Sequence, residues 1–329
     1  MELSLGLIVV LILIIGAEFV NGWTDAPNAI ATVVSTRVLS PRKAVLMAAV
    51  LNTLGVLSGT AVAATIGKGI VKMEAINLVT VGAAVTGIII WSTVAWRFGL
   101  PTSESHALVA GLAGASLATA GPQVLLLDGW RKVLIGLGFS TFFGFFAGLL
   151  IVLLIYKIFR NVKLKTTKSF FSKAQIFSAA FMAFSHGSND GQKFMGVFAL
   201  ALVLGGVTKE FHISLPVILV SSAIMGIGTS IGGYRIIKTM GMGIVKLETY
   251  QGFAAETGAA LCIELASRLG IPLSTTHTIT TSIMGVGAAK RLSAVRWGVV
   301  KEVVAAWVLT FPICAVIGYV VAYLFNMIF

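Results

Sequence analysis

Long apolar stretches recur along almost the whole of this 329-residue chain, and they constrain its fold more than any other feature. Each stretch is long enough, as a helix, to cross a hydrocarbon core of about 30 Å. Charged residues make up 11% of the chain and the mean hydropathy is +0.98, whereas charged residues approach about a quarter of a soluble domain. The sequence therefore predicts an all-α, multi-pass integral membrane protein without a separate soluble domain.

The net charge of +12 is better explained by membrane topology than by nucleic acid binding. The basic residues lie between the apolar stretches and do not follow one amphipathic face. The densest group lies in the only extended polar stretch, residues 157–173, near the middle of the chain. Because cytoplasmic loops are enriched in Lys and Arg, we expect a basic cytoplasmic loop here that touches anionic lipid. We expect no nucleic acid partner.

The sequence also contains an internal duplication. Three segments of the first half match three of the second half in the same order: residues 59–74 with 233–248, 97–114 with 268–285, and 19–28 with 184–193. The first of these pairs aligns without gaps and shares eight of its sixteen positions. The pattern predicts a first repeat over residues 1–156 and a second over 174–329, separated by the basic stretch.

The two repeats are predicted to cross the membrane in opposite orientations. We treat residues 75–120 and 249–289 as hairpins that return to their starting side. The loops on the side of the basic stretch then hold 15 Lys and Arg, and the opposite loops hold 5. Inverted repeats are typical of secondary transporters, whose binding site lies near the membrane midplane. Counting charges does not distinguish a re-entrant hairpin from two full spans.

Two matched polar segments interrupt apolar stretches at membrane depth. The first runs from Asn21 to Asn28 and the second from Ser185 to Lys193, and each contains glycine and an aspartate. Glycine weakens a helix and Pro27 removes a backbone donor, so we interpret both segments as broken helices. Non-helical backbone at this depth is tolerated where protein buries it or a cavity hydrates it.

The polar side chains of these segments are candidate cation ligands. An ionisable group inside a membrane costs several kcal/mol and usually has a functional partner, and hard cations prefer oxygen ligands. The predicted Na⁺ ligands are Asp25, Asn28, Asp190, Asn189 and Thr24. A buried hydrogen-bond network or ion pair that only holds helices together is the alternative. Lys193 replaces Asn28 in the aligned position, and a structural role and a substrate contact are equally consistent with it.

Two further matched segments, residues 99–106 and 270–277, carry clustered hydroxyl groups after a Gly-x-Pro sequence. Proline suits the first turn of a helix, where its missing N–H costs nothing. The hydroxyl groups would then lie beside unpaired N–H groups, at a helix end that carries about +0.5 charge and attracts anions. Helix capping alone is the alternative. The predicted ligands of a tetrahedral oxyanion are Ser103, Ser105, Ser274, Thr275, Thr276 and Gln192.

Four residues are predicted to support these ligands from behind: Thr102, His106, His277 and Glu264. His106 and His277 each follow a serine by three residues, a spacing that also fits the nucleophile and base of a hydrolase. An enzyme rarely needs such a pair twice, so we predict no catalytic residue and no enzymatic activity. Glu104 would repel an anion unless it turns away or pairs with a cation.

These motifs resemble those of the inorganic phosphate transporter family, the Pit-type phosphate permeases. The first pair is Asn21-Gly22-x-x-Asp25-x-x-Asn28-Ala29-Ile30-Ala31-Thr32 with His186-Gly187-x-Asn189-Asp190. The second pair is Pro101-x-Ser103-x-Ser105-His106 with Pro272-x-Ser274-Thr275-Thr276-His277. The resemblance implies phosphate uptake driven by Na⁺ or H⁺, about twelve membrane segments with two re-entrant hairpins, and a homodimer. Thr24 and Asn52 depart from the pattern of the family, which bears on the coupling ion.

The residues and the resemblance together predict a secondary active symporter that imports inorganic phosphate across the cell (inner or plasma) membrane. Na⁺ is the favoured coupling ion and no other cofactor is expected. Na⁺ would neutralise the aspartates, phosphate would bind between the two hydroxyl-bearing helix ends, and rocking of one repeat against the other would expose the site alternately. The alternatives are a proton-coupled phosphate or metal-phosphate symporter, a sulfate permease of the same family, a channel, and a regulatory docking role for the basic stretch.

Overall fold

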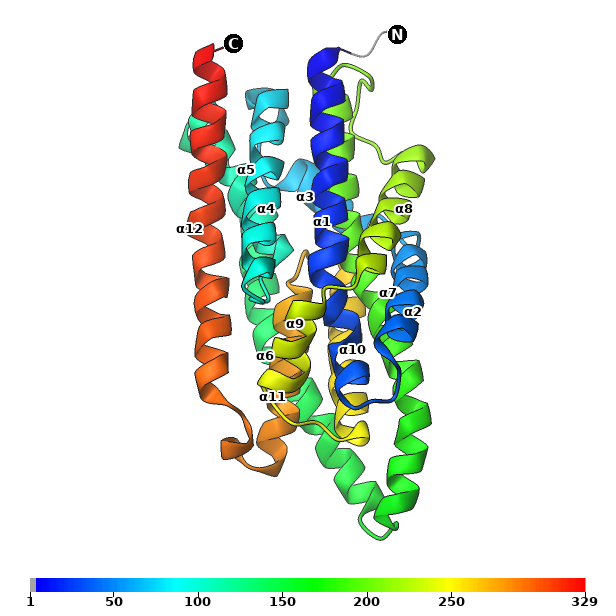
Figure 1. Ribbon diagram of the computed structural model, residues 1–329. Coiled ribbons are helices and arrows are strands. Elements are labelled where there is room, and N and C mark those ends of the chain that lie inside the picture. Colours follow the sequence, from blue (N-terminus) through cyan, green and yellow to red (C-terminus); the bar gives the residue numbers. More distant parts are fainter. Residues whose placement is uncertain (1–3, 329) are drawn as a thin grey trace.

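The computed structural model describes residues 4–328, which fold into twelve α-helices with short 3-10 and π segments and no strand within that range. The helices are α1 (Leu5–Ser35), α2 (Pro41–Val56), α3 (Ala61–Gly69), α4 (Leu78–Arg97), α5 (Glu104–Ala120), α6 (Leu127–Phe159), α7 (Leu164–Leu204), α8 (Leu215–Ile231), α9 (Tyr234–Lys238), α10 (Thr249–Arg268), α11 (Thr275–Lys290) and α12 (Trp297–Ile328). They form an elongated bundle in which both chain ends lie opposite the turn between α6 and α7 (Figure 1). The all-α prediction is confirmed.

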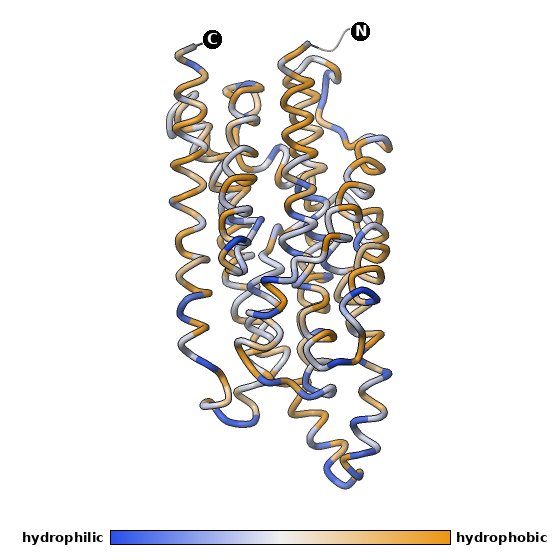
Figure 2. Tube along the Cα trace, viewed as in Figure 1, coloured by the Kyte–Doolittle hydropathy of each residue, from blue (hydrophilic) through white to orange (hydrophobic). Residues whose placement is uncertain are grey.

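Four of the helices, α1, α4, α6 and α12, are long and apolar enough to cross a membrane. Two further spans result if the bent pairs are each counted as one: α2 with α3, bent by 69°, and α8 with α9 and its π-helical extension, bent by 61°. Apolar residues cover most of α12 and the half of α1 that begins at Leu5, and hydrophilic residues gather at the α6–α7 turn and at mid-height in the view (Figure 2). The chain is thus a multi-pass membrane protein, and the twelve-segment count stays a prediction.

Two helical hairpins, α4–α5 and α10–α11, turn inside the bundle, and their turns have the same construction. Gly99 and Gly270 have φ of 71° and 65°, in the left-handed region that favours glycine. The next amide in each turn donates back to the last turn of the helix, from Leu100 to Ala95 and equivalently from Ile271. This is the Schellman termination, which satisfies carbonyls that the helix end leaves unpaired. The Gly-x-Pro sequence is therefore a helix stop followed by a new helix start.

The predicted breaks in the first pair of polar segments are wrong, because α1 and α7 run through them without interruption. Pro27 lies inside α1, where Gly233 of the α8–α9 turn packs against its ring. Gly187 of α7 serves close packing: a Cβ there would lie 2.2 Å from the backbone oxygen of Asn52 in α2. Neighbouring helices can compensate for Pro and Gly inside a membrane helix. The bends occur instead between α2 and α3 and between α8 and α9.

The basic stretch 157–173 is also more ordered than a loop. Helix α6 continues to Phe159 and α7 begins at Leu164, so only residues 160–163 lie outside the helices. Lys168 on the first turns of α7 pairs with Glu248, with 2.8 Å between Nζ and Oε2. The charges therefore extend along two helix ends that project from the bundle (Figure 1).

Helices of the two halves interlock. Helix α6 packs on α10 and α11 of the second half, whereas α12 packs on α4 and α5 of the first half. In the same way α2 packs on α7 and α8 packs on α1. Each hairpin is therefore held between a long helix of the other half on one side and α1 or α7 of its own half on the other.

Candidate functional site

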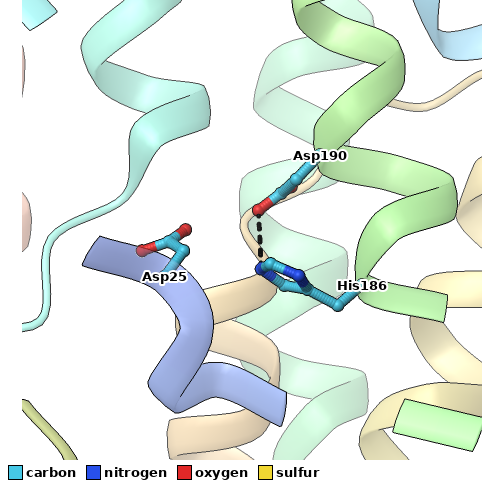
Figure 3. A group of neighbouring side chains, drawn as sticks. All are labelled: Asp25, His186 and Asp190. Carbon is cyan, nitrogen blue, oxygen red and sulfur yellow. Dashed lines mark ion pairs between the residues drawn. The ribbon is translucent and has the colours of Figure 1, made fainter. Parts of the chain in front are cut away.

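The middle turns of α1 and α7 place two carboxylates face to face. Asp25 and Asp190 are 3% and 1% exposed. Together with His186 they offer ligand atoms that all lie within 4.8 Å of one another. Figure 3 shows Asp25 on α1 pointing toward Asp190 and His186 on α7. The two aspartates that the sequence matched between its halves are brought together, and their oxygens are suited to a cation.

Asp190 is held by three neighbouring groups. Its Oδ1 accepts a hydrogen bond from the Lys193 ammonium one turn along α7. Its Oδ2 accepts from Thr275 Oγ1 at 2.8 Å and lies 3.2 Å from His186 Nε2. Asp25, by contrast, has no hydrogen bond to an ammonium, hydroxyl or amide group among residues 4–328, and its side-chain partner is the facing carboxyl group of Asp190. The two facing carboxylates therefore differ in how far their charge is neutralised.

The hairpin ends meet α1 and α7 in a crosswise manner. Asn28 of α1 donates to Thr276 Oγ1 at 2.9 Å and to Thr275 Oγ1 at 3.3 Å, at the start of α11. Lys193 of α7 donates to Ser105 Oγ at the start of α5, and to the Leu273 carbonyl at 2.9 Å. The hydroxyl groups that the sequence assigned to an oxyanion thus lie beside the amide and the ammonium.

The two hairpin ends also touch each other. Ser105 Oγ donates to the Leu273 carbonyl at 2.7 Å, which joins the start of α5 to the turn before α11. Ser103 and Ser274 are N-caps: their Oγ atoms accept from the backbone N–H groups of His106 at 3.3 Å and His277 at 3.1 Å. Capping therefore accounts for these two serines, and two helix N-termini converge on the aspartate pair.

Glu104 turns away from the hydroxyl groups at the two hairpin ends. Its carboxylate accepts from Ser92 Oγ at 2.6 Å and from Thr24 Oγ1 at 3.1 Å. This arrangement explains how an acid is accommodated at a helix end suited to anions. It also engages the Thr24 hydroxyl, which in addition donates to the Val20 carbonyl at 2.8 Å.

The two hairpin histidines pack as rings. His106 and His277 contact each other edge to face with 4.7 Å between ring centroids. His277 stacks on Trp307 at 3.7 Å and His106 on Phe311 at 4.6 Å, both on α12. Neither ring bonds a serine hydroxyl, since the serines cap the backbone. The arrangement lacks the nucleophile–base contact that a hydrolase requires.

Three predicted site residues lie away from the aspartate pair. Asn189 donates to Ser267 Oγ at 2.9 Å and toward the Ile271 carbonyl, behind the second hairpin. Gln192 accepts from the Val62 backbone N–H at 3.0 Å, at the start of α3. Glu264 pairs with Arg268 at 2.9 Å. Thr102 is buried in the first hairpin turn.

Two residues of the site, His186 and Ser92, were not among the site residues predicted from the sequence. His186 precedes Asp190 by four positions, which places both on one face of a helix; the assumption of a broken helix hid this signal. Ser92 lies in the middle of an apolar helix, and nothing local marks it as the partner of Glu104. Its role follows only from the packing of α4 against α5.

The arrangement offers complementary chemistry for two kinds of ion. Hydroxyl groups, an amide, an ammonium and two helix ends supply donors for an oxyanion. Paired carboxylates at the same depth supply oxygens for a small cation. A buried site of this kind, between the turns of two hairpins in a helical bundle with membrane-spanning helices, is typical of membrane proteins that transport ions.

Comparison with known proteins specifies the family. Residues 21–318 match the model of the Phosphate transporter family. The chain is 44% identical to a probable low-affinity inorganic phosphate transporter of Rhizobium meliloti, over 92% of this chain and 91% of that protein. It is 39% identical to the protein of the same name from Bacillus subtilis, over 98% of both. The chain therefore belongs to the phosphate transporter family, as the motifs predicted, and its relatives are transporters and not enzymes.

A solved structure has the same fold. The chain titled "The sodium-dependent phosphate transporter" matches with a TM-score of 0.89 at 24% identity, over 99% of this chain and 100% of that one. This likeness concerns the arrangement of the helices. It supports the assignment of the chain to a membrane-transporter fold.

Proposed function

We propose that this protein is a secondary active symporter that moves inorganic phosphate across the cell membrane together with a cation, with Na⁺ as the favoured ion. The observation that carries the proposal is the convergence of the start of α5 and the start of α11 on Asp25 and Asp190. Phosphate takes the donors Ser105, Thr275 and Thr276. The cation lies at the aspartates and offsets their charge, which would otherwise repel phosphate.

In this proposal, fewer of the predicted residues contact the cation and phosphate directly. Asp25, Asp190 and Asn28 keep their cation-side role, while Thr24 is directed to Glu104 and Asn189 to Ser267 behind the α10–α11 hairpin. Ser103 and Ser274 act on phosphate through the helix ends that they cap. The family and the name of the matching solved structure, a sodium-dependent phosphate transporter, support both ions.

We propose that the two halves are inverted relative to each other, which is the arrangement that alternating access requires. The crosswise contacts come in matched pairs: α6 on α10–α11 with α12 on α4–α5, and α2 on α7 with α8 on α1. We propose that the turns of α4–α5 and α10–α11 enter the membrane from opposite sides as re-entrant hairpins and meet at its midplane. Opening on either side then separates one hairpin end from its contacts.

Uptake of labelled phosphate into proteoliposomes tests the proposal. An inward Na⁺ gradient and an inward proton gradient are imposed separately, with the membrane potential clamped in both. We expect concentrative uptake with the Na⁺ gradient and none when both ions are at equilibrium. Uptake that responds only to the proton gradient contradicts the choice of Na⁺, and uptake that never exceeds equilibrium identifies a channel.

Competition defines the substrate. Unlabelled phosphate should suppress labelled uptake more strongly than sulfate at equal concentration, because phosphate retains a proton and can both donate and accept hydrogen bonds among Ser105, Thr275 and Asp190. Stronger competition by sulfate contradicts phosphate as the substrate. Arsenate, which has the same shape and protonation pattern, serves as the positive control.

A further inference from the structure

Asn28 and Lys193 occupy equivalent positions in the two halves. They align in the duplicated sequence, at the end of the segments 19–28 and 184–193. Asn28 bonds to Thr276 on the second hairpin, and Lys193 bonds to Ser105 on the first. Thr276 and Ser105 align with each other as well. The contact is therefore the same in both halves, but a neutral amide makes it in one and an ammonium in the other.

The partners of the Lys193 ammonium are those that a bound cation would take. Its three contacts are a carboxylate oxygen of Asp190, the hydroxyl oxygen of Ser105 and the backbone carbonyl of Leu273. Oxygens of these three kinds are the ligands of hard cations in proteins. The side chain of Lys193 is 1% exposed, so solvent does not screen its charge. A Na⁺ ion at this position would compete with a cation that is covalently part of the protein.

Within residues 4–328, no ammonium is hydrogen-bonded to the carboxylate of Asp25. The residue one turn along from it is Asn28, whose amide is directed to the second hairpin. The nearby charged groups are Glu104, which is bonded to Ser92 and Thr24, the facing Asp190, and the Lys193 ammonium, which is bonded to Asp190. A buried carboxylate that faces a second carboxylate is costly until a cation or proton neutralises it. One ammonium, hydrogen-bonded to Asp190, is present for two facing carboxylates, so charge balance calls for one mobile cation, on the Asp25 side of the pair.

We propose that the Lys193 ammonium is a resident cation that fills the place of one coupling ion in the second half of the site. The protein then binds one cation fewer per phosphate than a site with asparagine at both positions. The inference rests on the proposed symport function and specifies its stoichiometry. Lys193 therefore determines the coupling stoichiometry, which is the number of cations that accompany each phosphate.

Equilibrium binding of radioactive Na⁺ to purified protein in detergent tests the inference without transport. Lys193→Asn gives the second half the residue of the first, and Lys193→Gln is a second neutral variant. We expect each variant to bind one more Na⁺ per chain at saturation than the wild-type protein. Lys193→Arg keeps the charge and should keep the wild-type count. Thermal unfolding of each variant identifies the folded preparations that enter the comparison.

Equal Na⁺ counts in the wild-type protein and a folded neutral variant would overturn the inference. The reciprocal variant Asn28→Lys supplies Asp25 with its own ammonium, and it should lose the Na⁺ that the wild-type protein binds. If the wild-type protein binds no Na⁺, the choice of Na⁺ in the proposed function fails. The gain of one Na⁺ in Lys193→Asn still decides the inference in that case, so the two failures are distinguishable.

Discussion

Two buried glutamates show how differently an acid can be accommodated inside this protein. Glu256 on α10 accepts hydrogen bonds from Thr32, Gln175 and Ser178, contributed by α1 and α7. Glu18 on α1 is 2% exposed, and within residues 4–328 neither of its carboxyl oxygens meets a hydrogen-bond partner. The first acid ties three helices together, whereas the second has only the nearby Ser221 hydroxyl of α8 to offset its desolvation.

Neutralising these two acids should therefore change stability in different ways. Glu256→Gln replaces an acceptor with an amide N–H₂ that faces hydroxyl and amide donors, so we expect a loss of about 1–3 kcal/mol in unfolding free energy. Glu18→Gln removes a carboxyl that has only the Ser221 hydroxyl nearby, and we expect no loss or a gain. Thermal unfolding midpoints of the purified variants in one detergent provide the comparison. A larger loss for Glu18→Gln would contradict the contrast.

The chemistry of single residues was readable from the sequence, but their partners were not. Paired motifs identified Asp25 and Asp190 as an acid from each half, and the structure places them together. Asn189 belongs to the same motif and yet faces Ser267 behind the second hairpin. Its neighbour in the sequence is in the site and it is not, because successive residues of a helix point in directions about 100° apart.

At the scale of elements, small residues determine how closely helices approach. Gly136, Ser140, Gly144 and Gly148 recur every four positions along α6, and all four are buried. A Cβ at Gly144 would lie 2.5 Å from Thr281 Oγ1, and one at Gly148 would lie 2.4 Å from the Ser282 carbonyl. The ridge joins α6 to α11 within the fold, as close packing of small residues does in membrane helices.

This ridge predicts a position-dependent response to bulky side chains. Gly148→Leu forces α6 away from α11, and we expect it to destabilise the protein by several kcal/mol, as overpacking does. Gly138→Leu on the same helix has the same chemical change, but beyond the local backbone of α6 no atom of the described residues lies within 4 Å of a Cβ there. We expect that control to unfold at the wild-type temperature or above. Equal effects of the two substitutions would show that helix propensity, not packing, determines the outcome.

Helix ends were predicted better than helix interiors. The Gly-x-Pro-x-Ser sequences correctly predicted the turns of both hairpins, because a left-handed glycine and a capping serine act locally. The predicted breaks in α1 and α7 failed, because local propensity of Pro27 and Gly187 was outweighed by helices that are distant in sequence. Tertiary contacts of this kind leave no local signal, and neither does the bend between α2 and α3.

For the whole molecule, the interlocked halves restrict how the site can open. Rocking of one intact half against the other would pull α6 off α10–α11 and α12 off α4–α5, which are extensively packed pairs. The short helices α3 and α9 make only small contacts with the hairpin of the other half. Thr65 of α3 donates to the Gly270 carbonyl at 2.8 Å, and Thr239 after α9 donates to the Gly99 carbonyl at 2.8 Å. Each bond ties a bent helix of one half to the hairpin turn of the other.

These two threonine bonds predict that the hairpin turns loosen independently. Thr65→Val should raise amide hydrogen exchange in α3 and in residues 269–274, and leave residues 98–103 unchanged. Thr239→Val should do the reverse. Loss of one hydrogen bond of about 1 kcal/mol corresponds to about a fivefold faster exchange in the affected segment. Exchange mass spectrometry on the purified protein resolves both segments.

Thr86→Val is the matched control, because Thr86 donates within α4 to the Gly82 carbonyl at 2.8 Å and ties no hairpin turn to a bent helix. It should leave both turns at wild-type exchange. If either Thr65→Val or Thr239→Val raises exchange in both hairpin turns, the two turns open as one unit. Independent opening of each hairpin is then excluded. Independent loosening means that one hairpin end can leave the site while the other stays, which is the geometric requirement for exposing a bound ion to one side at a time.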